Sequence, residues 1–296
     1  MIKKKFEDIP ISTRTIIVST DVEINIENLY NNLPITEYKV IEKKRGRKKK
    51  GVIEEIKNTV EDGSIVSIKY QGNIRGVDLR KKKKSNKFFR NAVTIILSVN
   101  NKLINLKITS NGKFQVTGCK DYENCQKAIK YLFDEIIQNK EKYMCKYGDS
   151  VNIIFNNVMT NKDFSVGFMI NRENLDKIIN NNTEYNSLLE TSFGYTGVNL
   201  KMKLNKNIDR TFDCLKLDLS DNTYTNHKID YQTYLKRLTE KELMKENKDR
   251  HITFLIFQSG NVIMSGMNEH FMKRYYEIFY DIVDKNREQL VDKLEK

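Results

Sequence analysis

Two runs of basic side chains are the residues of this sequence best suited to a specific chemistry. Lys43–Lys50 reads KKRGRKKK and Arg80–Lys84 reads RKKKK. Between Lys39 and Lys87 there are 17 Lys and Arg against 6 Asp and Glu, which accounts for most of the net charge of +13 carried by the 296 residues. Ammonium and guanidinium groups at this density neutralise phosphates, so this segment indicates a localised contact with a polyanion, most commonly a nucleic acid.

The first run has three interpretations that the sequence leaves open: a DNA-binding arm, a nuclear-import signal, or a solvated loop. The residues of the predicted basic arm are Lys43, Lys44, Arg45, Arg47, Lys48, Lys49 and Lys50.

Catalytic chemistry has no comparable pattern. His227, His251 and His270 are scattered, and neither G-x-S-x-G nor a P-loop is present. The acidic pair Glu54–Glu55 lacks the spacing of a metal-ligand set. We therefore expect no enzyme, no metal site and no cofactor.

The cysteines and the apolar runs limit the compartment. The four cysteines, which we expect to be core or surface thiols, contain no C-x-x-C pair and fit a reducing compartment: Cys119, Cys125, Cys145 and Cys214. No run approaches the ~18 apolar residues of a membrane span. Met1–Phe6 reads MIKKKF without an apolar stretch behind it, so we expect neither a secretory signal nor a membrane partner.

An internal repeat is the most informative feature of the chain. Ser110–Gly118 reads SNGKFQVTG, and Gln258–Gly266 reads QSGNVIMSG. Both glycines of the first block recur in the second at an offset of 148 residues. Each block follows a strand-like run, at Leu103–Thr109 and Ile252–Phe257, which predicts two copies of a strand, glycine turn, strand and helix.

The elements around the two blocks repeat as well. We predict long helices over Tyr122–Ile137 and Asn268–Val283, because their apolar residues recur every three or four positions. Upstream, Thr15–Ile26 and Val151–Phe168 read as strands. Each is followed by a short helix, at Glu27–Leu33 or at Arg172–Ile179.

Both faces of the second-copy strands are apolar. Phe254, Ile256, Val262 and Met264 alternate with Leu255, Phe257, Ile263 and Ser265. If the helices cover the first set, the second set faces outward. Such a face is either sandwiched by an insertion or presented to a partner.

These residues carry a specific resemblance. Leu255–Gly266 (LIFQSGNVIMSG) with the helix after it resembles the second-repeat signature of the TATA-box-binding protein (TBP) family, and Ser110–Lys120 resembles the first. Ile17–Thr20 matches the family's opening strand, and Ser187–Lys203 resembles its second stirrup. The resemblance covers most of 10–41, 89–140 and 150–290. The insertions and the composition are most similar to the divergent members encoded by large DNA viruses.

The resemblance implies an α+β, TBP-like saddle: two pseudo-repeats forming one curved antiparallel sheet, with helices on the convex face. It implies a first repeat over 10–142 with a basic insertion at 42–88, and a second repeat over 147–290 with an insertion at 205–250. The implied function is that of a general transcription initiation factor that binds and bends A·T-rich promoter DNA through the minor groove.

The implied partners and compartment follow from the same resemblance. A transcription factor IIB-like protein would meet the segment Glu190–Gly197, and RNA polymerase machinery would be recruited to a chain that is monomeric on DNA. We expect the nucleus or a cytoplasmic viral factory, with packaging in the virion as a further option.

The resemblance also assigns residues in the second repeat. Phe257 falls on one wedge position, and Tyr195 or Phe193 on the other. Asn157, with Asn156 beside it, matches a base-contacting Asn. Ser265 matches a Thr that donates to a base edge. The remaining assignments are two floor residues, Leu255 and Ile263, and two phosphate contacts, Lys201 and Lys203.

The first repeat departs from the family pattern. Val18 and Thr117 match it, and Lys113 is placed with the DNA-binding residues. Thr109 and Ala92 stand at the wedge positions, however, although Phe88 and Phe89 lie close by. Ile16 replaces a central Asn, and two polar residues replace the apolar floor, namely Lys107 and Gln115.

Two alternatives remain open. The polar first repeat favours an architectural DNA- or RNA-binding saddle without TATA specificity. The same fold also occurs as a module of DNA glycosylases and ribonucleases, but no catalytic domain accompanies it in this sequence.

Overall fold

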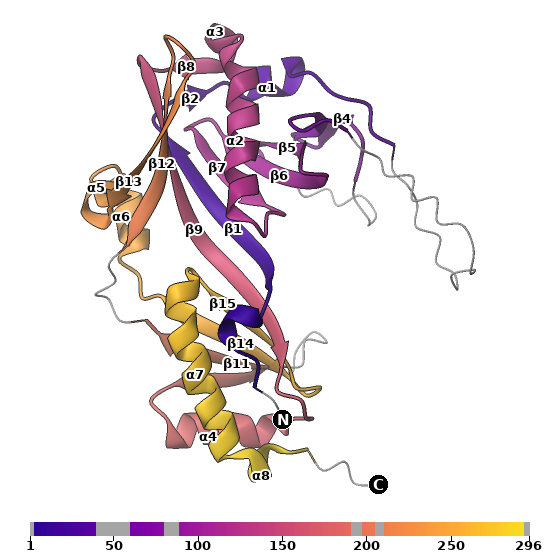
Figure 1. Cartoon of the computed structure of the whole chain (residues 1–296), viewed down its shortest axis with the longest axis vertical. Coiled ribbons are helices and arrows are strands. Elements are labelled where there is room, and N and C mark those ends of the chain that lie inside the picture. The colour runs from indigo at the N-terminus through magenta and orange to yellow at the C-terminus, as the bar shows by residue number, and fades with distance from the viewer. Residues whose placement is uncertain (1–2, 40–59, 80–88, 191–196, 205–209, 293–296) are drawn as a thin grey trace. The chain divides into compact units, whose positions relative to one another are not determined.

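The computed structural model describes residues 3–39, 60–79, 89–190, 197–204 and 210–292. The chain divides into two compact units (Figure 1). The first-repeat unit comprises the described residues of Ile16–Asn156 and Asp213–His227. The second-repeat unit comprises those of Met1–Thr15, Asn157–Phe212 and Lys228–Lys296. Residues 213–227, from the predicted second insertion, thus belong to the unit that holds the first repeat.

The first-repeat unit combines antiparallel strands with one long helix. The strand order is β1-β7-β6-β5-β3-β4; β12 pairs with β9 and β13, and β2 pairs with β8. The strands that lie wholly or partly in it are β1 (Ile11–Thr20), β2 (Glu23–Ile24), β3 (Ile65–Tyr70), β4 (Asn73–Gly76), β5 (Ala92–Val99), β6 (Lys102–Thr109), β7 (Lys113–Thr117), β8 (Met144–Lys146), β9 (Ser150–Ser165), β12 (Thr211–Asp218) and β13 (Tyr224–Asp230). Its helices are α1 (Ile26–Asn32), α2 (Tyr122–Ile137) and α3 (Lys140–Tyr143).

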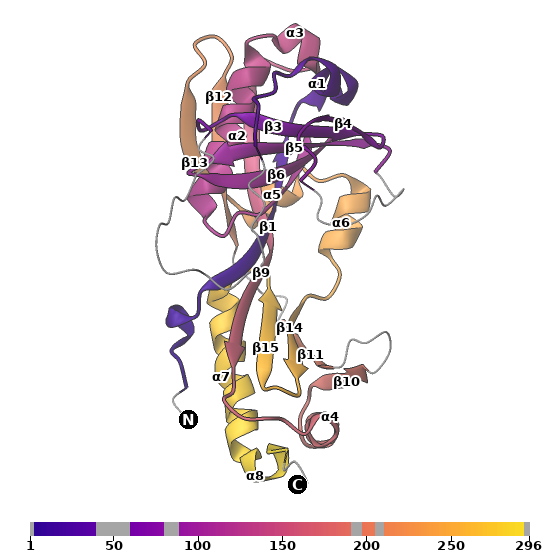
Figure 2. The ribbon, with the colours of Figure 1, turned by 90° about the vertical axis from the view of Figure 1, so that its right-hand side faces the viewer.

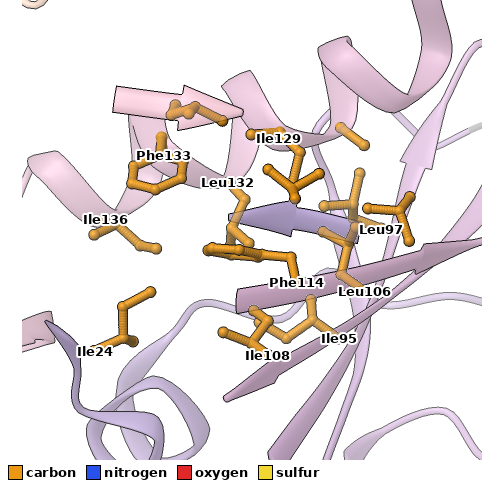
Figure 3. Close-up of a cluster of buried hydrophobic side chains, with 14 of the residues drawn as sticks. Ile24, Ile95, Leu97, Leu106, Ile108, Phe114, Ile129, Leu132, Phe133 and Ile136 are labelled. Atoms are coloured by element: carbon orange, nitrogen blue, oxygen red, sulfur yellow. The ribbon is translucent and has the colours of Figure 1, made fainter. Parts of the chain in front are cut away.

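The core of this unit lies between the sheet and α2. Phe114 of β7 packs against Phe133 of α2, with ring centroids 5.7 Å apart, as Figure 3 shows. Leu106 and Ile108 from β6 are fully buried in the same cluster, as is Ile129 from α2. Because strand side chains alternate, burying this set leaves the intervening β6 residues on the other face.

The second-repeat unit has the same architecture. Its strand order is β10-β11-β14-β15-β9, and α7 lies along the sheet (Figure 2). Its further strands are β10 (Asn186–Glu190), β11 (Gly197–Lys203), β14 (His251–Phe257) and β15 (Asn261–Gly266). Its helices are η1 (Phe6–Asp8), α4 (Arg172–Asn182), α5 (Tyr231–Leu235), α6 (Glu240–Glu246), α7 (Glu269–Lys285) and α8 (Arg287–Leu290). The expected α+β class is confirmed.

The predicted duplication appears in the hydrogen-bond register itself. In β6 and β7, Asn105 lies opposite Thr117 and Lys107 opposite Gln115. In β14 and β15, Thr253 lies opposite Ser265 and Leu255 opposite Ile263. All four positions are related by the same offset of 148 residues. Sequence position therefore predicts which residues occupy equivalent sites in the two units.

The two repeat glycines make the turns that this register needs. Gly112 has a φ of +67° and Gly260 a φ of +80°, a region that costs L-residues energy but not glycine. A Cβ on Gly260 would lie 2.1 Å from the Phe168 carbonyl oxygen, and one on Gly112 would lie 2.2 Å from that of Val22. The Gly112 carbonyl accepts a backbone hydrogen bond from Thr20 N, and the Gly260 carbonyl accepts one from Val166 N. Glycine is thus required at both turns.

The predicted helices are confirmed, with small shifts at their ends. Helix α2 spans the expected residues, and its Asp121 side chain accepts a hydrogen bond from Glu123 N. Helix α7 begins one residue later than expected and ends at Lys285, with Asn268 as its cap. In both helices a polar side chain satisfies an amide that the first turn leaves unpaired.

Both predicted insertions contain regular structure. The hairpin expected near Gly72–Asn73 is β3–β4, and its turn residues Gln71 and Gly72 both have positive φ. Strand β3 pairs with β5 as β10 pairs with β11, so part of 42–88 belongs to the repeat rather than interrupting it. In 205–250, the helix expected near Tyr231–Glu246 forms as α5 and α6, preceded by the β12–β13 hairpin.

Candidate nucleic-acid interface

The second-repeat unit presents one sheet face that is apolar and only partly covered. Phe254, Ile256, Val262 and Met264 are at most 1% exposed and form the core with α7. Their strand neighbours Leu255, Phe257, Ile263 and Ser265 are half-buried on the other face, as the alternation predicts. We call this other side of the sheet the second open face.

Rows of side chains run across the second open face from strand to strand. One row joins Leu188, Asn199, Leu255, Ile263 and Asp163. Leu188 of β10 is 64% exposed, and no sequence motif marks it as part of this surface. The row gives the face an apolar centre bordered by polar groups.

A second row on this face is hydrophilic. It joins Asn186, Lys201, Thr253, Ser265 and Asn161 through β10, β11, β14, β15 and β9. Its Ser265 hydroxyl and Lys201 ammonium can donate hydrogen bonds to an acceptor above the sheet.

The two lysines predicted to contact phosphates differ in whether a neighbouring carboxylate already binds the ammonium group. Lys201 and Lys203 are both exposed on β11. Lys203 Nζ lies 2.7 Å from Asp249 Oδ2, so an approaching phosphate would compete with this carboxylate. Both side chains are exposed, so the pair itself contributes little stability.

The two predicted central asparagines lie in different surroundings. Asn157 is half-buried, and its Nδ2 donates to Thr160 Oγ1 at 2.9 Å. Its Oδ1 is buried and has no hydrogen-bond partner among the described residues. Asn156 is only 5% exposed, so it does not present its amide to solvent as a base-contacting residue requires. The prediction for Asn156 is corrected: the side chain is buried.

The first-repeat unit presents an equivalent face that is polar. Thr109 and Gln115 are half-buried on it, as are Thr117 and Lys113. Lys107 occupies the place of Leu255, and Phe89, which is 66% exposed, lies with its ring centroid 3.6 Å from Lys107 Nζ. In the sequence Phe89 only lies close to a wedge position. Its exposure in the structure makes it a candidate wedge residue.

Two residues of this unit lie elsewhere than predicted. Val18 is fully buried in the core, so its assignment to the DNA-binding surface is wrong in this structure; Ile17 and Ser19 have the opposite orientation in β1. The match of the short motif IVST does not fix which face each residue occupies, because a shift of one residue exchanges the faces. Ala92, predicted at a wedge position, lies opposite Thr109 and is only 6% exposed.

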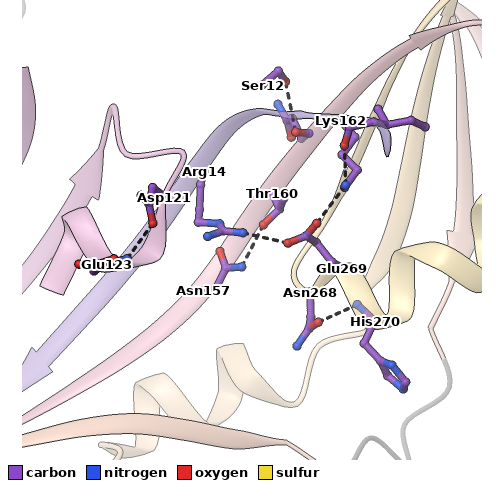
Figure 4. Close-up of polar contacts among 12 residues, drawn as sticks. Ser12, Arg14, Asp121, Glu123, Asn157, Thr160, Lys162, Asn268, Glu269 and His270 are labelled. Atoms are coloured by element: carbon purple, nitrogen blue, oxygen red, sulfur yellow. Dashed lines mark hydrogen bonds and ion pairs between the residues drawn. The ribbon is translucent and has the colours of Figure 1, made fainter. Parts of the chain in front are cut away.

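A buried ion cluster fixes the edge of the second-repeat unit. Lys162 is 3% exposed, and its ammonium donates to the Ile9 carbonyl at 2.6 Å and lies 3.0 Å from Glu269 Oε1. Arg14 Nη2 lies 3.0 Å from Glu269 Oε2, so one carboxylate serves two cations (Figure 4). Glu269 opens α7, where the helix dipole also favours a negative charge.

Several predicted site residues lie outside the described part of the chain. They are Phe193 and Tyr195, with Phe88 beside the other wedge, and the basic arm of Lys43, Lys44, Arg45, Arg47, Lys48, Lys49 and Lys50.

The other chemical expectations can be compared with the described residues. Cys119, Cys125 and Cys214 are buried and Cys145 is exposed, and none of the four forms a disulfide bond with another described residue. Within the described ranges, no group of three His, Cys, Asp or Glu is arranged to hold a metal ion. The helices of that same part are too short or too polar to span a bilayer.

Comparisons with known proteins give two curated relatives, both viral. The chain is 25% identical to "Uncharacterized protein 335L" of Invertebrate iridescent virus 6 over 214 residues, covering 70% of this chain and 64% of that protein. It is 35% identical over 112 residues to a "TATA-box-binding protein-like" protein of Acanthamoeba polyphaga mimivirus, covering 33% of this chain and 30% of that protein. The chain therefore spans less than two thirds of the length of either relative.

Two further comparisons, with solved structures and with protein-family models, give one weaker match and no match respectively. Among solved structures, Methanococcus jannaschii TBP aligns over 94% of this chain and 98% of its own, with 13% identity and a TM-score of 0.45. No protein-family model matches the chain. The repeat signature, the α+β architecture and the mimivirus relative agree with one another: the chain resembles the TATA-box-binding protein family and is similar to a divergent, TBP-like viral protein.

Proposed function

We propose that this chain is a TBP-like transcription initiation factor that binds double-stranded DNA through its open faces, bends promoter DNA at the minor groove and recruits transcription machinery. The observation that carries the proposal is the second open face, where Leu255, Phe257 and Ile263 stay half-exposed on strands whose opposite side is fully buried. The mimivirus relative, whose name is TATA-box-binding protein-like, supports it.

The chemistry of this face suits the minor groove. Apolar side chains inserted between base steps unstack them and bend the duplex, a mode that the TBP family itself exemplifies. At A·T pairs the minor groove offers only acceptors, which Ser265 and Thr117 can meet as donors. Pyrimidine–purine steps unstack most easily, so an A·T-rich site with TA steps is the expected target.

The two units would contribute unequally. The second open face has Leu255 and Phe257 where the first-repeat unit has Lys107 and Thr109. We assign most of the bending to the second-repeat unit, and phosphate contacts to the first-repeat unit and its basic insertion. Phe89 above Lys107 is the one described aromatic that could add a wedge there.

A bending assay on two equivalent positions tests this proposal. Phe257→Ala removes the ring from the second open face, and Thr109→Ala is its matched control at the same register position of the other repeat. In a circular-permutation gel shift on TATA-containing duplex, Phe257→Ala should abolish position-dependent mobility and weaken binding at least ~10-fold. Thr109→Ala should leave both nearly unchanged. Equal effects of the two substitutions would defeat the asymmetric assignment.

The second candidate function is an architectural DNA- or RNA-binding protein without TATA preference. The polar Lys107, Gln115 and Thr109 of the first-repeat unit favour it. Unbent binding that is equally strong on scrambled duplex, in the same assay and at the same salt concentration, would support this candidate and overturn the first.

Recruitment is the remaining part of the proposal. By resemblance, a transcription factor IIB-like protein would bind near Glu190–Gly197, with RNA polymerase machinery following, while the chain acts as a monomer on DNA. A supershift of the DNA complex by a purified IIB-like protein, abolished when residues 191–196 are replaced by Gly and Ser, is the expected result.

A further inference from the structure

A basic groove in the second-repeat unit belongs to neither the hydrophobic core nor the centre of the open face. It measures about 800 Å³ and runs between the end of β11, the start of β14, the start of β10 and helix α7. The residues that line it are Glu184, Tyr185, Asn186, Lys201, Lys203, Leu204, His251, Arg274, Tyr275 and Ile278. Three of them, Arg274, Tyr275 and Ile278, come from α7, which packs on the side of the sheet away from the open face.

The charge of the groove is positive. Lys201, Lys203 and Arg274 are basic residues, and the imidazole of His251 lines the groove with them. Glu184 is the one carboxylate among the lining residues. Lys203 forms an ion pair with Asp249, whereas Lys201 and Arg274 form no ion pair with any described residue. An anionic ligand is therefore favoured.

The walls of the groove are apolar and held in place. Tyr275 is 8% exposed, and its hydroxyl donates to the Lys203 carbonyl at 2.8 Å, which fixes the ring against β11. Leu204 is 5% exposed, and its amide donates to the Arg250 carbonyl at 2.8 Å. Tyr185 and Ile278 complete this surface and pack against the core. A ligand that fills the groove must supply apolar groups as well as negative charge.

We propose that this groove binds an acidic peptide segment of a protein partner, one that carries aliphatic or aromatic residues between its carboxylates. Carboxylates would pair with Arg274 and Lys201, and the apolar side chains would pack on Tyr185, Tyr275 and Ile278. Tyr and Arg are the residue types enriched where protein partners dock. A nucleic-acid backbone would satisfy the charges but offers little apolar surface to these walls.

Part of the groove lies away from the proposed DNA contacts, because Arg274 and Ile278 lie on α7. Lys201 and Lys203 are shared with the open face, so peptide binding and DNA binding are expected to compete weakly. Variants for the test are therefore placed on α7 alone.

The probe is a fluorescein-labelled dodecapeptide, Asp-Phe-Asp-Leu-Asp-Glu-Phe-Glu-Asp-Leu-Glu-Asp, titrated with the full chain and followed by fluorescence anisotropy. We expect a Kd of about 100 µM or tighter. Arg274→Glu should weaken binding at least ~10-fold, since it places a like charge against the ligand. Lys177→Glu, an equal charge change on exposed α4 of the same unit, is the matched control and should have no effect.

Two further measurements separate the proposal from its alternatives. A second peptide with Ser in place of Phe and Leu should bind at least ~10-fold more weakly, because it leaves the apolar walls unfilled. Arg274→Glu should change the affinity for duplex DNA less than ~2-fold. Equal binding of both peptides, equal weakening in Lys177→Glu, or a weakening confined to duplex binding would each overturn the proposal. Failure of DNA bending by the wild-type chain would leave it intact.

Discussion

At the residue scale, the second-repeat unit keeps a lysine almost entirely out of water. Lys162 is held by the Ile9 carbonyl, the ring of Phe6 at 4.5 Å from its ammonium, and the carboxylate of Glu269. A buried ammonium is costly unless it is paired, so Glu269 does more for the fold than a surface acid does. The same carboxylate also binds Arg14, which ties the start of β1 to helix α7.

Removal of this carboxylate is expected to be costly. Glu269→Gln should lower the free energy of unfolding by about 2–4 kcal/mol, because it leaves the buried Lys162 charge without its counter-ion. The control is Glu277→Gln, on the same helix, whose ion pair with Lys3 is exposed on both sides. That substitution should cost less than ~1 kcal/mol. Urea unfolding of the full chain measures both, and equal destabilisation would contradict the buried-pair argument.

At the element scale, the β12–β13 hairpin is attached to helix α2 of the first-repeat unit. The Tyr224 hydroxyl donates to Asp134 Oδ1 at 2.8 Å, and Lys130 lies over the Tyr224 ring at 5.2 Å. Burial first, and then the hydrogen bond to the Asp134 carboxylate, raise the pKa of Tyr224 well above its ordinary value of 10.0. The hairpin therefore depends on a protonated phenol.

This attachment predicts a decrease of stability at alkaline pH. In the unfolded chain Tyr224 ionises near its ordinary pKa of 10.0, whereas the folded chain keeps it protonated. The contribution is thus complete below that pH and declines progressively as the pH rises above it. Tyr224→Phe should lower stability by about 1 kcal/mol at neutral pH and reduce the alkaline decrease. Denaturant unfolding at a series of pH values measures this; an unchanged pH profile in the variant would refute it.

At the scale of the whole molecule, the two repeats share a backbone pattern but differ in surface chemistry. The register of β6 with β7 recurs in β14 with β15, yet an apolar floor in one copy is a lysine and a glutamine in the other. The excess of basic residues between Lys39 and Lys87 belongs to the polar copy. After duplication, the two copies therefore diverged, so that one has the apolar floor and the other has the excess of basic residues.

The separation predicts a specific salt dependence. Deletion of Lys43–Lys50 should reduce the slope of log affinity for DNA against log salt concentration, by about 0.9 for each phosphate that the protein no longer neutralises. Bending by the second-repeat unit should persist at low salt, because it depends on Phe257. An unchanged slope would show that the basic run does not neutralise phosphates, and would favour the import-signal or solvated-loop interpretation.

The local sequence pattern was sufficient to predict the strands, helices and turns that depend on hydrophobic periodicity or on a glycine. The alternation in Ile252–Phe257 predicts which side chains enter the core, and the glycine spacing predicts both tight turns. The helix at Tyr122–Ile137 is predicted to the residue from its apolar face, and the structure adds Asp121 as its cap. The resemblance to the TBP family follows from these same residues.

Only the tertiary structure shows which face of a long strand is buried and which surfaces form from segments that are distant in sequence. Val18 and Asn156 are buried although their motifs suggest exposure: Val18 shares the buried side of β1 with Ile16, and Asn156 ends a run of four consecutive buried residues in β9. Leu188, Phe89 and the groove beside Arg274 emerge only once their strands and α7 are placed. A sequence determines period and turn locally, but the exposure of a side chain depends on which distant residues pack against it.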